Sequence, residues 1–473
     1  MTRNIILNVD SYKTSHFLQY PENISAVSSY IESRGGQFRE TVFFGLQAFL
    51  KEYLTQPITE RDIDEAKALL PAHGVPFNEA GWRYILDKYD GYLPIQIEAL
   101  PEGTVVPVKN ALVQVVNTDA ECAWLTSYVE TALLRAIWYP TTVATVSWQC
   151  KQVIRGYLEE TADTTDGLAF KLHDFGARGV SSEETAALGG MAHLVNFQGT
   201  DTLSSILAAR RYYGADMAGF SIPAAEHSTI TAWGRENEAE AYANMLRQFG
   251  GAGKLVAVVS DSYDLWNALE NLWGDELRTQ VENSGGTLVI RPDSGDPVSI
   301  VTETIERLMK IFGYRVNSKG YRVLPDCIRV IQGDGICIQS LEAILAAMKL
   351  RKQSADNIAF GMGGALLQQV NRDTLKFAMK ASAARVGGLW RDVFKDPVTD
   401  AGKRSKKGRL AVVNENGSLK TIQARDLGRR ENLLSVVFQN GNIVHEETFE
   451  TIRSRALFCY ASPDQAKTLR KPA

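Results

Sequence analysis

A repeated pattern in the middle of the chain constrains the fold more than any other feature. Between residues 169 and 360, a short apolar run, a loop rich in Gly, Asp, Ser or Pro, and an amphipathic stretch follow one another seven times. Such alternation is typical of parallel strands joined by crossover helices. The expected fold class is therefore α/β, and the even succession favours a closed or nearly closed barrel over an open doubly wound sheet. The apolar runs are 169–173, 193–197, 219–222, 255–260, 287–290, 328–331 and 357–360.

The composition narrows the class of protein. The chain has 473 residues, of which 45% are hydrophobic, so it can bury a large core. At roughly 100–200 residues per domain, this length suggests two to four folding units, or one barrel with additions. The 51 basic and 55 acidic side chains leave a net charge of −4, without the basic excess typical of nucleic-acid binding. Nucleic acid is therefore not an expected partner.

The cysteines and the apolar segments indicate the cellular location. The five cysteines are widely spaced and include no CxxC pair, which favours neither a disulfide framework nor a zinc site. The first ten residues are too few and too polar for a signal peptide. No apolar run approaches the roughly 18 residues that span a bilayer. We expect a soluble, cytoplasmic protein that does not interact with a membrane.

The N-terminal third has a different pattern from the middle of the chain. Residues 41–54 and 121–138 have a helical pattern, and Pro140 is expected to end the second helix. Residues 93–99 alternate like a strand with one buried face. Helices and strands are therefore mixed in this region.

A ligand site is expected at the carboxyl ends of the strands in either architecture. One polar loop means little, whereas seven loops that converge on one rim predict a site. The residues that follow the seven runs are Asp174, Phe175, Arg178, Asp201, Glu226, His227, Asp261, Asp264, Arg291, Asp293, Asp334, Gly361, Gly363 and Gly364.

A glycine-rich loop and an arginine suggest phosphate binding. FGMGGALLQQV, starting at Phe360, places three glycines before an expected helix, so that backbone N–H groups can approach an anion. A tight packing turn explains these glycines about as well. Arg291, on another loop, offers a bidentate cation for the same anion. Together they favour a sugar phosphate.

Two acidic residues lie in glycine-containing turns, Asp293 in RPDSG and Asp334 in QGDG. Each carboxylate either stabilises its own turn or takes part in ligand binding. In the second case it accepts hydrogen bonds from ribose hydroxyls or holds a hydrated Mg²⁺ through water.

The loop HDFGARG suggests a slot for a flat ring. Phe175 and Arg178 can cover such a ring with an apolar face and a guanidinium plane. A core phenylalanine beside a surface arginine is the alternative for this loop taken alone.

His227 is the most informative of the six histidines. It lies beside Glu226 at an expected helix start near the rim. A structural histidine is the commoner explanation in general, and we assign His173 and His193, within expected strands, to that role.

Ordered motifs carry a resemblance to a known family. They are DSYKTSH at Asp10, YPENIS, DKYDGYLPI, TDAECAWLT, HDFGARGVSSEET, VNFQGTDT, PAAEHSTITAWG, VSDSYD, RPDSG, RVIQGDG and KDPVTDAGKRSKKGR. The chain resembles the nicotinamide phosphoribosyltransferase family from Asp10 almost to its C-terminus. The resemblance implies an enzyme of NAD salvage that forms nicotinamide mononucleotide and pyrophosphate from nicotinamide and phosphoribosyl pyrophosphate. It implies Mg²⁺ as cofactor and ATP as co-substrate.

The resemblance also implies a fold and an assembly. Residues 166–372 would form an incomplete, seven-stranded TIM-like (β/α) barrel. Residues 1–165 and 373–473 would form a second, mainly antiparallel α/β domain. The active sites would lie at the interface of a homodimer, to which residues 10–35 contribute. Nicotinate phosphoribosyltransferase is the nearest alternative function, and a non-catalytic signalling protein is a more distant one.

Site residues follow from the resemblance as well. The base would be bound by Phe175, Arg178, Asp201, Ser221 and the partner subunit's Tyr12. The ribose and its 5′-phosphate would be bound by Arg291, Asp293, Gly333, Asp334, Gly363 and Gly364. Phosphate-binding cations of the second subunit would be Arg34, Arg372, Lys380, Lys395 and Lys403. The catalytic group would comprise Asp293 and His227, the residue phosphorylated from ATP, with Asp261 and Glu226 beside it. Mg²⁺ would be held through pyrophosphate and water, with no direct protein ligand.

Base selectivity is expected to depend on Asp201. An ionised carboxylate there attracts the amide of nicotinamide and repels the negative charge of nicotinate. Three positions depart from the family pattern and bear on this selectivity, namely Ala177 in place of Tyr, Met362 in place of a small residue and Ala257 in place of Ser.

Overall fold

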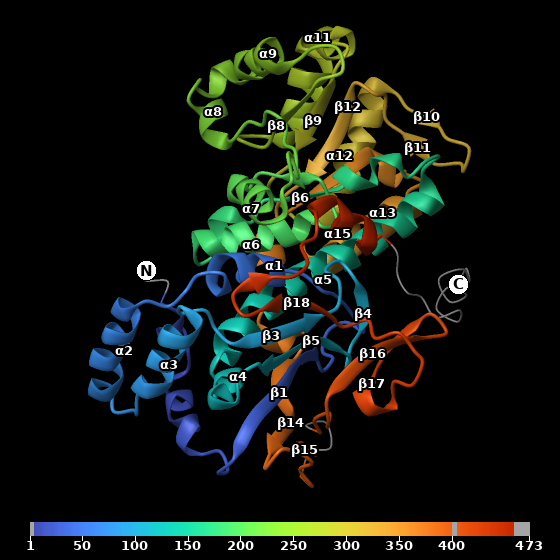
Figure 1. Cartoon of the computed structure of the whole chain (residues 1–473). Coiled ribbons are helices and arrows are strands. Elements are labelled where there is room, and N and C mark those ends of the chain that lie inside the picture. The colour runs from blue at the N-terminus through green and yellow to red at the C-terminus, as the bar shows by residue number, and fades with distance from the viewer. Residues whose placement is uncertain (1–3, 400–403, 458–473) are drawn as a thin grey trace. The chain divides into compact units, whose positions relative to one another are not determined.

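The computed structural model describes residues 4–399 and 404–457 and divides them into two compact units (Figure 1). The first, which we call the parallel unit, contains residues 146–208 and 216–370. The second, the antiparallel unit, contains the described residues before 146, residues 209–215 and the described residues from 371 onwards.

Six parallel strands form the sheet of the parallel unit within the described residues, in the order β7-β6-β13-β12-β9-β8. Helices connect successive strands along the chain, as expected for βα units. The strands are β6 (Leu172–Asp174), β7 (Gly199–Thr200), β8 (Leu255–Val259), β9 (Thr287–Arg291), β12 (Ile328–Gln332) and β13 (Ile358–Met362). The helices are α6 (Glu183–Leu194), α7 (Leu203–Tyr213, of which residues 209–213 are assigned to the antiparallel unit), α8 (His227–Thr231), α9 (Glu238–Phe249), α10 (Leu265–Asn267), a π-helix (Ala268–Glu276), α11 (Arg278–Asn283), α12 (Pro297–Phe312), α13 (Ile338–Leu350) and α14 (Gly364–Leu367). The small hairpin of β10 (Arg315–Val316) and β11 (Arg322–Val323) follows α12.

Five of the seven predicted strands are confirmed, as β6, β8, β9, β12 and β13. The prediction for residues 193–197 is wrong, because α6 continues to Leu194 and β7 begins only at Gly199. A short apolar run is compatible with a buried helix end as well as with a strand, and periodicity cannot separate the two. His193 therefore lies in a helix rather than in a strand, although it is buried as expected of a structural residue.

The predicted strand at residues 219–222 forms only isolated bridges. Phe220 bridges Gly199 of β7, and Ala224 bridges Ala257 of β8, so this segment contacts both edge strands of the sheet. Pro223 accepts a hydrogen bond from the N–H of Ala257 at 2.9 Å but has no N–H to donate, so a regular ladder cannot form there. The sheet is thus a curled, parallel half-barrel, and a seventh regular strand is not confirmed.

Residues from neighbouring strands form a small apolar cluster on the inner face of the curled sheet. Ala257, Val289 and Ile331 form a small apolar cluster, against which Phe175 and Ala359 pack. Because side chains on one face of a strand recur every second residue, the next inward positions lie at the carboxyl ends of the strands. This interior cluster supports the residues of the rim.

The antiparallel unit contains a seven-stranded sheet within the described residues, in the order β15-β14-β1-β5-β3-β18-β19. Strand β1, near the start of the chain, lies between β14 and β5, so the two chain ends share one sheet. The strands are β1 (Ile24–Ser33), β3 (Ile95–Ala99), β5 (Ala111–Asn117), β14 (Phe377–Val386), β15 (Leu389–Asp392), β18 (Ser435–Gln439) and β19 (Asn442–Ile443). Two further antiparallel pairs are β2 (Glu40–Val42) with β4 (Val105–Pro107), and β16 (Leu410–Glu415) with β17 (Ser418–Gln423).

Helices of this unit are α1 (Leu46–Phe49), α2 (Glu60–Ala72), α3 (Glu79–Tyr89), α4 (Leu125–Tyr128), α15 (Phe449–Ala456) and the start of α5 (Glu130–Thr161). The predicted strand at 93–99 is confirmed as β3, whereas residues 41–54 include strand β2 as well as helix. Pro140 does not end a helix, because α5 continues through it. The Thr141 hydroxyl bonds to the backbone N–H and C=O of Phe44 beside this proline, which helps to hold the interrupted helix in place.

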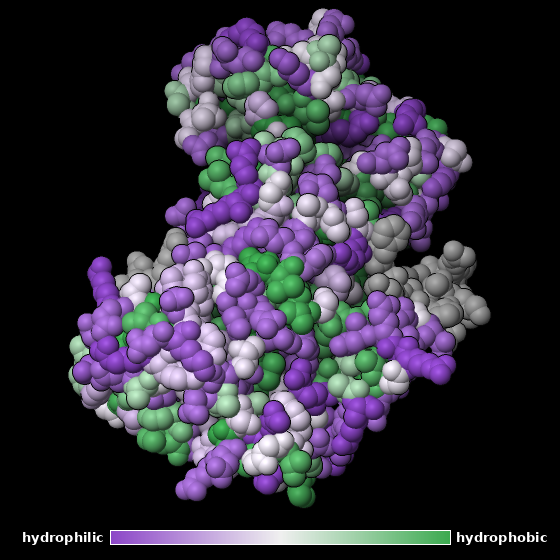
Figure 2. Space-filling view, viewed as in Figure 1, coloured by the Kyte–Doolittle hydropathy of each residue, from purple (hydrophilic) through white to green (hydrophobic). Residues whose placement is uncertain are grey.

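The surface view agrees with the mixed composition. Hydrophilic residues cover much of the face drawn in Figure 2, including α2 and α3, and hydrophobic residues are scattered among them. No helix among the described residues is long and apolar enough to cross a membrane.

Candidate functional site

Phe175 lies over two glycines at the carboxyl end of the parallel sheet. A Cβ atom on Gly361 would lie 2.0 Å from Cε2 of Phe175, and one on Gly333 would lie 3.2 Å from the same atom. These glycines occupy the inward positions directly after Ala359 and Ile331, so the aromatic ring replaces the side chains that would otherwise fill this layer. Gly361 is therefore a packing glycine.

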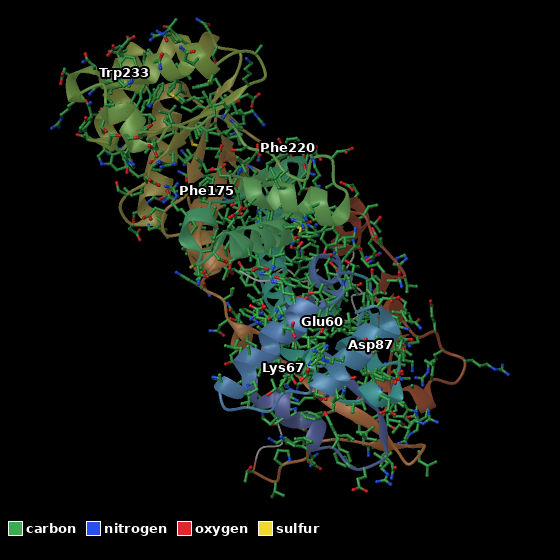
Figure 3. The ribbon with its side chains drawn as sticks, turned by 60° about the vertical axis from the view of Figure 1, so that its left-hand side comes forward. Glu60, Lys67, Asp87, Phe175, Phe220 and Trp233 are labelled. Carbon is green, nitrogen blue, oxygen red and sulfur yellow. The ribbon has the colours of Figure 1, made fainter. Side chains whose placement is uncertain are left out.

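Phe175 and Arg178 lie in the loop after β6, as predicted. The N–H of Phe175 donates to the carbonyl of Met362 at 3.0 Å, which holds the loop against β13. Phe175 is half-buried, whereas Arg178 is exposed in the short 3₁₀-helix that follows. Figure 3 labels Phe175 together with Phe220 and Trp233 of the same unit. The exposed face of this loop can therefore receive a flat ring.

Asp201 and Ser221 come together from two segments of the parallel unit. The Ser221 hydroxyl donates to Oδ1 of Asp201 at 2.5 Å. Both residues are exposed, so the carboxylate is accessible to a ligand that donates hydrogen bonds. The N–H of Asp201 donates to the carbonyl of Asp174 at 3.0 Å, which connects this pair to the Phe175 loop.

His227, Asp261, Asp293 and Arg291 form one continuous chain of contacts. The His227 Nε2 atom lies 3.1 Å from Oδ1 of Asp261, and Oδ2 of Asp261 accepts the N–H of Asp293 at 3.0 Å. Arg291 Nη2 donates to Oδ2 of Asp293 at 2.9 Å. The Asp261 side chain is only 5% exposed, whereas that of His227 is 46% exposed. Asp261 thus fixes an accessible imidazole and a neighbouring acidic turn at once.

Glu226 has a local role in the structure. It precedes α8, and its carboxylate accepts a hydrogen bond from the Ser228 hydroxyl. Its own N–H donates to Oγ1 of Thr229 at 3.2 Å. These contacts stabilise the first turn of the helix that begins with His227.

Gly363 and Gly364 of the glycine-rich loop have more space around them than Gly361. A Cβ on Gly363 would meet its nearest protein atom at 3.6 Å, and one on Gly364 would meet none within 4 Å. Packing within the protein therefore does not require these two glycines, in contrast to Gly361, and they leave room for a ligand at the backbone. Asp334, beside Gly333, has an exposed side chain, and its carbonyl accepts from Nε2 of Gln332 at 2.9 Å.

Cations of the antiparallel unit gather around β1 and β14. Partial burial lowers the pKa of Lys380; Glu130 raises it, and the charges of Arg34, Lys13 and Arg372 lower it further. Arg34, Arg372 and Lys380 are predicted site residues, whereas Lys13 is not among the predictions, although it directly follows Tyr12 in the DSYKTSH motif.

Tyr12 belongs to the same cationic surface. Its side chain is 60% exposed, and the Lys13 ammonium lies 5.3 Å from the centre of its ring. Lys13 is buried and pairs with Glu130 at 2.7 Å. The exposed aromatic ring thus lies beside a cluster of cations whose charge is partly neutralised by Glu130 and Glu32.

The basic segment at 403–409 is partly neutralised. Lys406 pairs with Glu32 at 2.6 Å, and Arg409 pairs with Glu98 at 3.2 Å. Lys395 has an N–H that donates to the Ser405 hydroxyl at 2.8 Å. The predicted phosphate ligand Lys403 lies outside the described residues.

Comparison with known proteins decides the family. Residues 4–97 match the model of the nicotinamide phosphoribosyltransferase N-terminal domain, and residues 170–442 match that of the nicotinate phosphoribosyltransferase (NAPRTase) family. A nicotinamide phosphoribosyltransferase of Xanthomonas campestris pv. campestris is 57% identical over 460 residues, which cover 96% of this chain and 98% of that protein. This chain belongs to the nicotinamide phosphoribosyltransferase family.

A second relative agrees with this assignment, and a solved structure shares the fold. A nicotinamide phosphoribosyltransferase of Acinetobacter baylyi is 33% identical and covers 94% of this chain and 96% of that protein. A crystal structure of nicotinate-nucleotide pyrophosphorylase from Pyrococcus furiosus matches with a TM-score of 0.61 at 16% identity, covering 100% of this chain and 98% of that one. At this identity the match shows a shared fold alone. The family resemblance expected from the motifs is confirmed.

Proposed function

We propose that this chain is a pentosyltransferase that forms nicotinamide mononucleotide and pyrophosphate from nicotinamide and phosphoribosyl pyrophosphate, in NAD salvage. The observation that carries the proposal is the 57% identity, over 96% of the chain, to a nicotinamide phosphoribosyltransferase. The rim supports it with an aromatic wall at Phe175, an accessible acceptor at Asp201, and glycines at 363 and 364 that protein packing does not require.

The residues of the rim suggest how the reaction is promoted. The pyridine nitrogen of nicotinamide has a free lone pair, so it can attack C1 of the ribose without a general base. Phe175 would orient the ring, and Asp201 would accept from the carboxamide NH₂. Positioning of the two reactants, and cations that stabilise the departing pyrophosphate, would then lower the barrier. Arg291 and the glycine loop would bind the 5′-phosphate, and Asp293 with Asp334 would hold the ribose.

Mg²⁺ fits this site as a substrate-bound ion. Among the described residues, no three His, Cys, Asp or Glu side chains converge to hold a metal. Asp261 already contacts both His227 and Asp293. The exposed Asp334 and the half-buried Asp293 offer oxygen atoms that suit a hydrated Mg²⁺. When bound, the ion would neutralise charge on the pyrophosphate leaving group.

ATP stimulation is proposed to act through His227. Its imidazole is accessible, and Asp261 fixes its orientation through Nε2, so the other ring nitrogen is the candidate phosphate acceptor. A phosphorylated His227 would add negative charge close to Asp293 and the site of Mg²⁺ and pyrophosphate. A His227→Ala variant should keep basal turnover and lose the ATP response, and retained ATP stimulation would refute this role.

A homodimer would complete the site with Tyr12, Arg34, Arg372, Lys380 and Lys395 of a second copy. The support is the exposed Tyr12 ring beside the cluster around Lys380. Mixing inactive Arg291→Ala and Arg372→Ala variants tests this assembly. If one site needs both copies, random pairing restores about a quarter of wild-type activity; no recovery after subunit exchange would contradict the shared site.

A seven-position barrel, with residues 219–225 as its irregular seventh position, is proposed from their bridges to β7 and β8.

One assay tests the function as a whole. Mononucleotide formation is measured with nicotinamide or nicotinate, phosphoribosyl pyrophosphate and Mg²⁺, with and without ATP. We expect kcat/KM for nicotinamide to exceed that for nicotinate by at least about 100-fold, because a like charge close to Asp201 costs several kcal/mol in a dry pocket. Preference for nicotinate would overturn the proposal in favour of the nicotinate enzyme, and turnover of neither base would overturn it altogether.

A further inference from the structure

The carboxylate of Asp174 is fully buried at the end of β6, next to the proposed base site. Its Oδ1 accepts the N–H of Gly176 at 2.7 Å, and its Oδ2 accepts the Thr200 hydroxyl at 3.5 Å. Both of these donors are uncharged. Among the described residues, Asp174 takes part in no ion pair, which is rare for a buried carboxylate.

Asp174 connects the two loops that carry the base-binding groups. Gly176 belongs to the loop of Phe175, whose ring is the proposed wall for the base. The carbonyl of Asp174 accepts the N–H of Asp201, the proposed acceptor for the carboxamide. One residue thus holds the aromatic wall and the polar acceptor in register through its side chain and its backbone.

Helix α6 packs closely against this carboxylate, and a glycine on α6 makes the close approach possible. A Cβ atom on Gly190 of α6 would lie 2.9 Å from Oδ2 of Asp174 and 2.7 Å from Cβ of Ser205 in α7. A Cβ on Gly176 would lie 2.6 Å from Cγ of Leu367 in α14. The bond from the Gly176 N–H and the close packing of α6 together hold the carboxylate beside the loop of Phe175.

We propose that Asp174 is a specificity-determining residue, which positions both base-binding loops and adds a second, buried negative charge behind them that disfavours an anionic base. This inference rests on the proposed function. Asp201 would act by direct contact with the base, whereas Asp174 would act at a distance through the low-dielectric interior, where charges are poorly screened.

The same geometry predicts a pH dependence. Burial raises the pKa of Asp174 to about 6, and the like charge of Asp201 contributes to the rise. The other titratable neighbour is His173 of β6, whose pKa is lowered by burial, so that it is neutral at neutral pH. Gly190 of α6, Ser205 of α7 and Leu367 of α14 bring no charge. Discrimination against nicotinate should therefore strengthen as the pH rises through about 6.

The first test substitutes Asp174→Asn, which keeps the shape of the side chain and removes the charge. We expect the ratio of kcat/KM for nicotinate over nicotinamide to rise about tenfold, the effect of one charge acting from several ångströms away. Asp201→Ser should raise it further. Asp326→Asn is the matched control, because Asp326 is 94% exposed and lies just before β12, at the opposite end of the sheet. An unchanged ratio in an Asp174→Asn protein that still uses nicotinamide would overturn the inference.

The second test is a pH profile of the wild type, so its first readout does not depend on folding of a mutant. The same ratio is measured in the wild type between about pH 5.5 and pH 8, a range in which most nicotinate is anionic with an unprotonated ring nitrogen. We expect it to fall as Asp174 ionises near pH 6, and we expect this step to be absent in Asp174→Asn. A flat profile in the wild type, together with an unchanged ratio in Asp174→Asn, would refute a role for Asp174 while leaving the proposed function intact. Turnover of neither base by the wild type would instead overturn the proposed function, and this inference with it.

Discussion

The two units build their candidate functional surfaces in different ways. In the parallel unit, Phe175, Asp261 and Asp293 each come one or two residues after a strand, so order along the chain predicts the rim. In the antiparallel unit, Tyr30 of β1 pairs with Lys380 of β14, some 350 residues further along the chain. The cationic cluster around Lys380 therefore exists only because distant strands are neighbours in the sheet. The comparison shows that local patterns predict sites on βα units, whereas sites on antiparallel sheets depend on pairing.

The largest effect is expected from the packing glycine of the parallel unit. Gly361→Ala would place a Cβ 2.0 Å from the Phe175 ring, so the ring must move and the base slot is lost. We expect kcat/KM for nicotinamide to fall by about 100-fold, as a 1 Å displacement of a binding group can cause. Gly156→Ala in α5 is the control, because nothing lies within 4 Å of the new Cβ. Near-normal activity of Gly361→Ala would show that the ring does not form the slot.

The buried acid of the antiparallel unit should make it less stable at high pH. Burial raises the pKa of Glu102 to about 7, although its carboxylate accepts the N–H groups of Gly45 and Gln47 and the hydroxyl of Tyr213. The pKa of Glu102 is higher in the folded than in the unfolded state. Its stabilising contribution to the free energy of unfolding is therefore fully present below about pH 4.5 and is lost as the pH rises through 7. Relative to Glu102→Gln, the wild type should lose about 2 kcal/mol between pH 5 and pH 8. Urea unfolding at both pH values measures this, and a pH-independent difference would contradict it.

The buried histidine of the parallel unit should have the opposite effect. Burial lowers the pKa of His193 to about 3, and its ring contacts the Ser147 hydroxyl and the carbonyl of Gly199. The unfolded state binds the proton more tightly, so this contribution is present above about pH 6.5 and is lost as the pH falls toward 3. Compared with His193→Gln, the wild type should lose about 2 kcal/mol between pH 8 and pH 5. Hydrogen exchange resolved by peptide should place the loss of stability in the parallel unit. A loss of equal size in both units would contradict an effect confined to the parallel unit.

The smallest effect is expected from the cationic cluster. Lys380→Met removes one of several cations, so KM for phosphoribosyl pyrophosphate should rise about tenfold, the effect of roughly one charge-assisted hydrogen bond. The kcat for nicotinamide should change little. Lys420→Met, at a 62% exposed position on β17, is the matched control. An unchanged KM for phosphoribosyl pyrophosphate in Lys380→Met would show that Lys380 does not help to bind the phosphates.

Two predictions made from the sequence are wrong for one physical reason. Residues 193–197 form the end of a buried helix and the turn after it, and Pro140 lies inside one, because packing partners compensate for patterns that locally favour something else. Glu102 and Asp174 carry no motif that marks them as buried. Their burial, and with it their raised pKa, depends on helices and strands far away in the chain.

The sequence by itself determined the parallel βα organisation, the family and most of the rim, because strand-then-helix periodicity and the loop motifs are local properties. Only the tertiary structure decided that Gly361 is needed for packing while Gly363 and Gly364 are not. It also decided that Lys13 joins the cationic cluster, and that Asp174 connects the loops of Phe175 and Asp201. These are properties of distances between segments far apart in the chain, which no local pattern encodes.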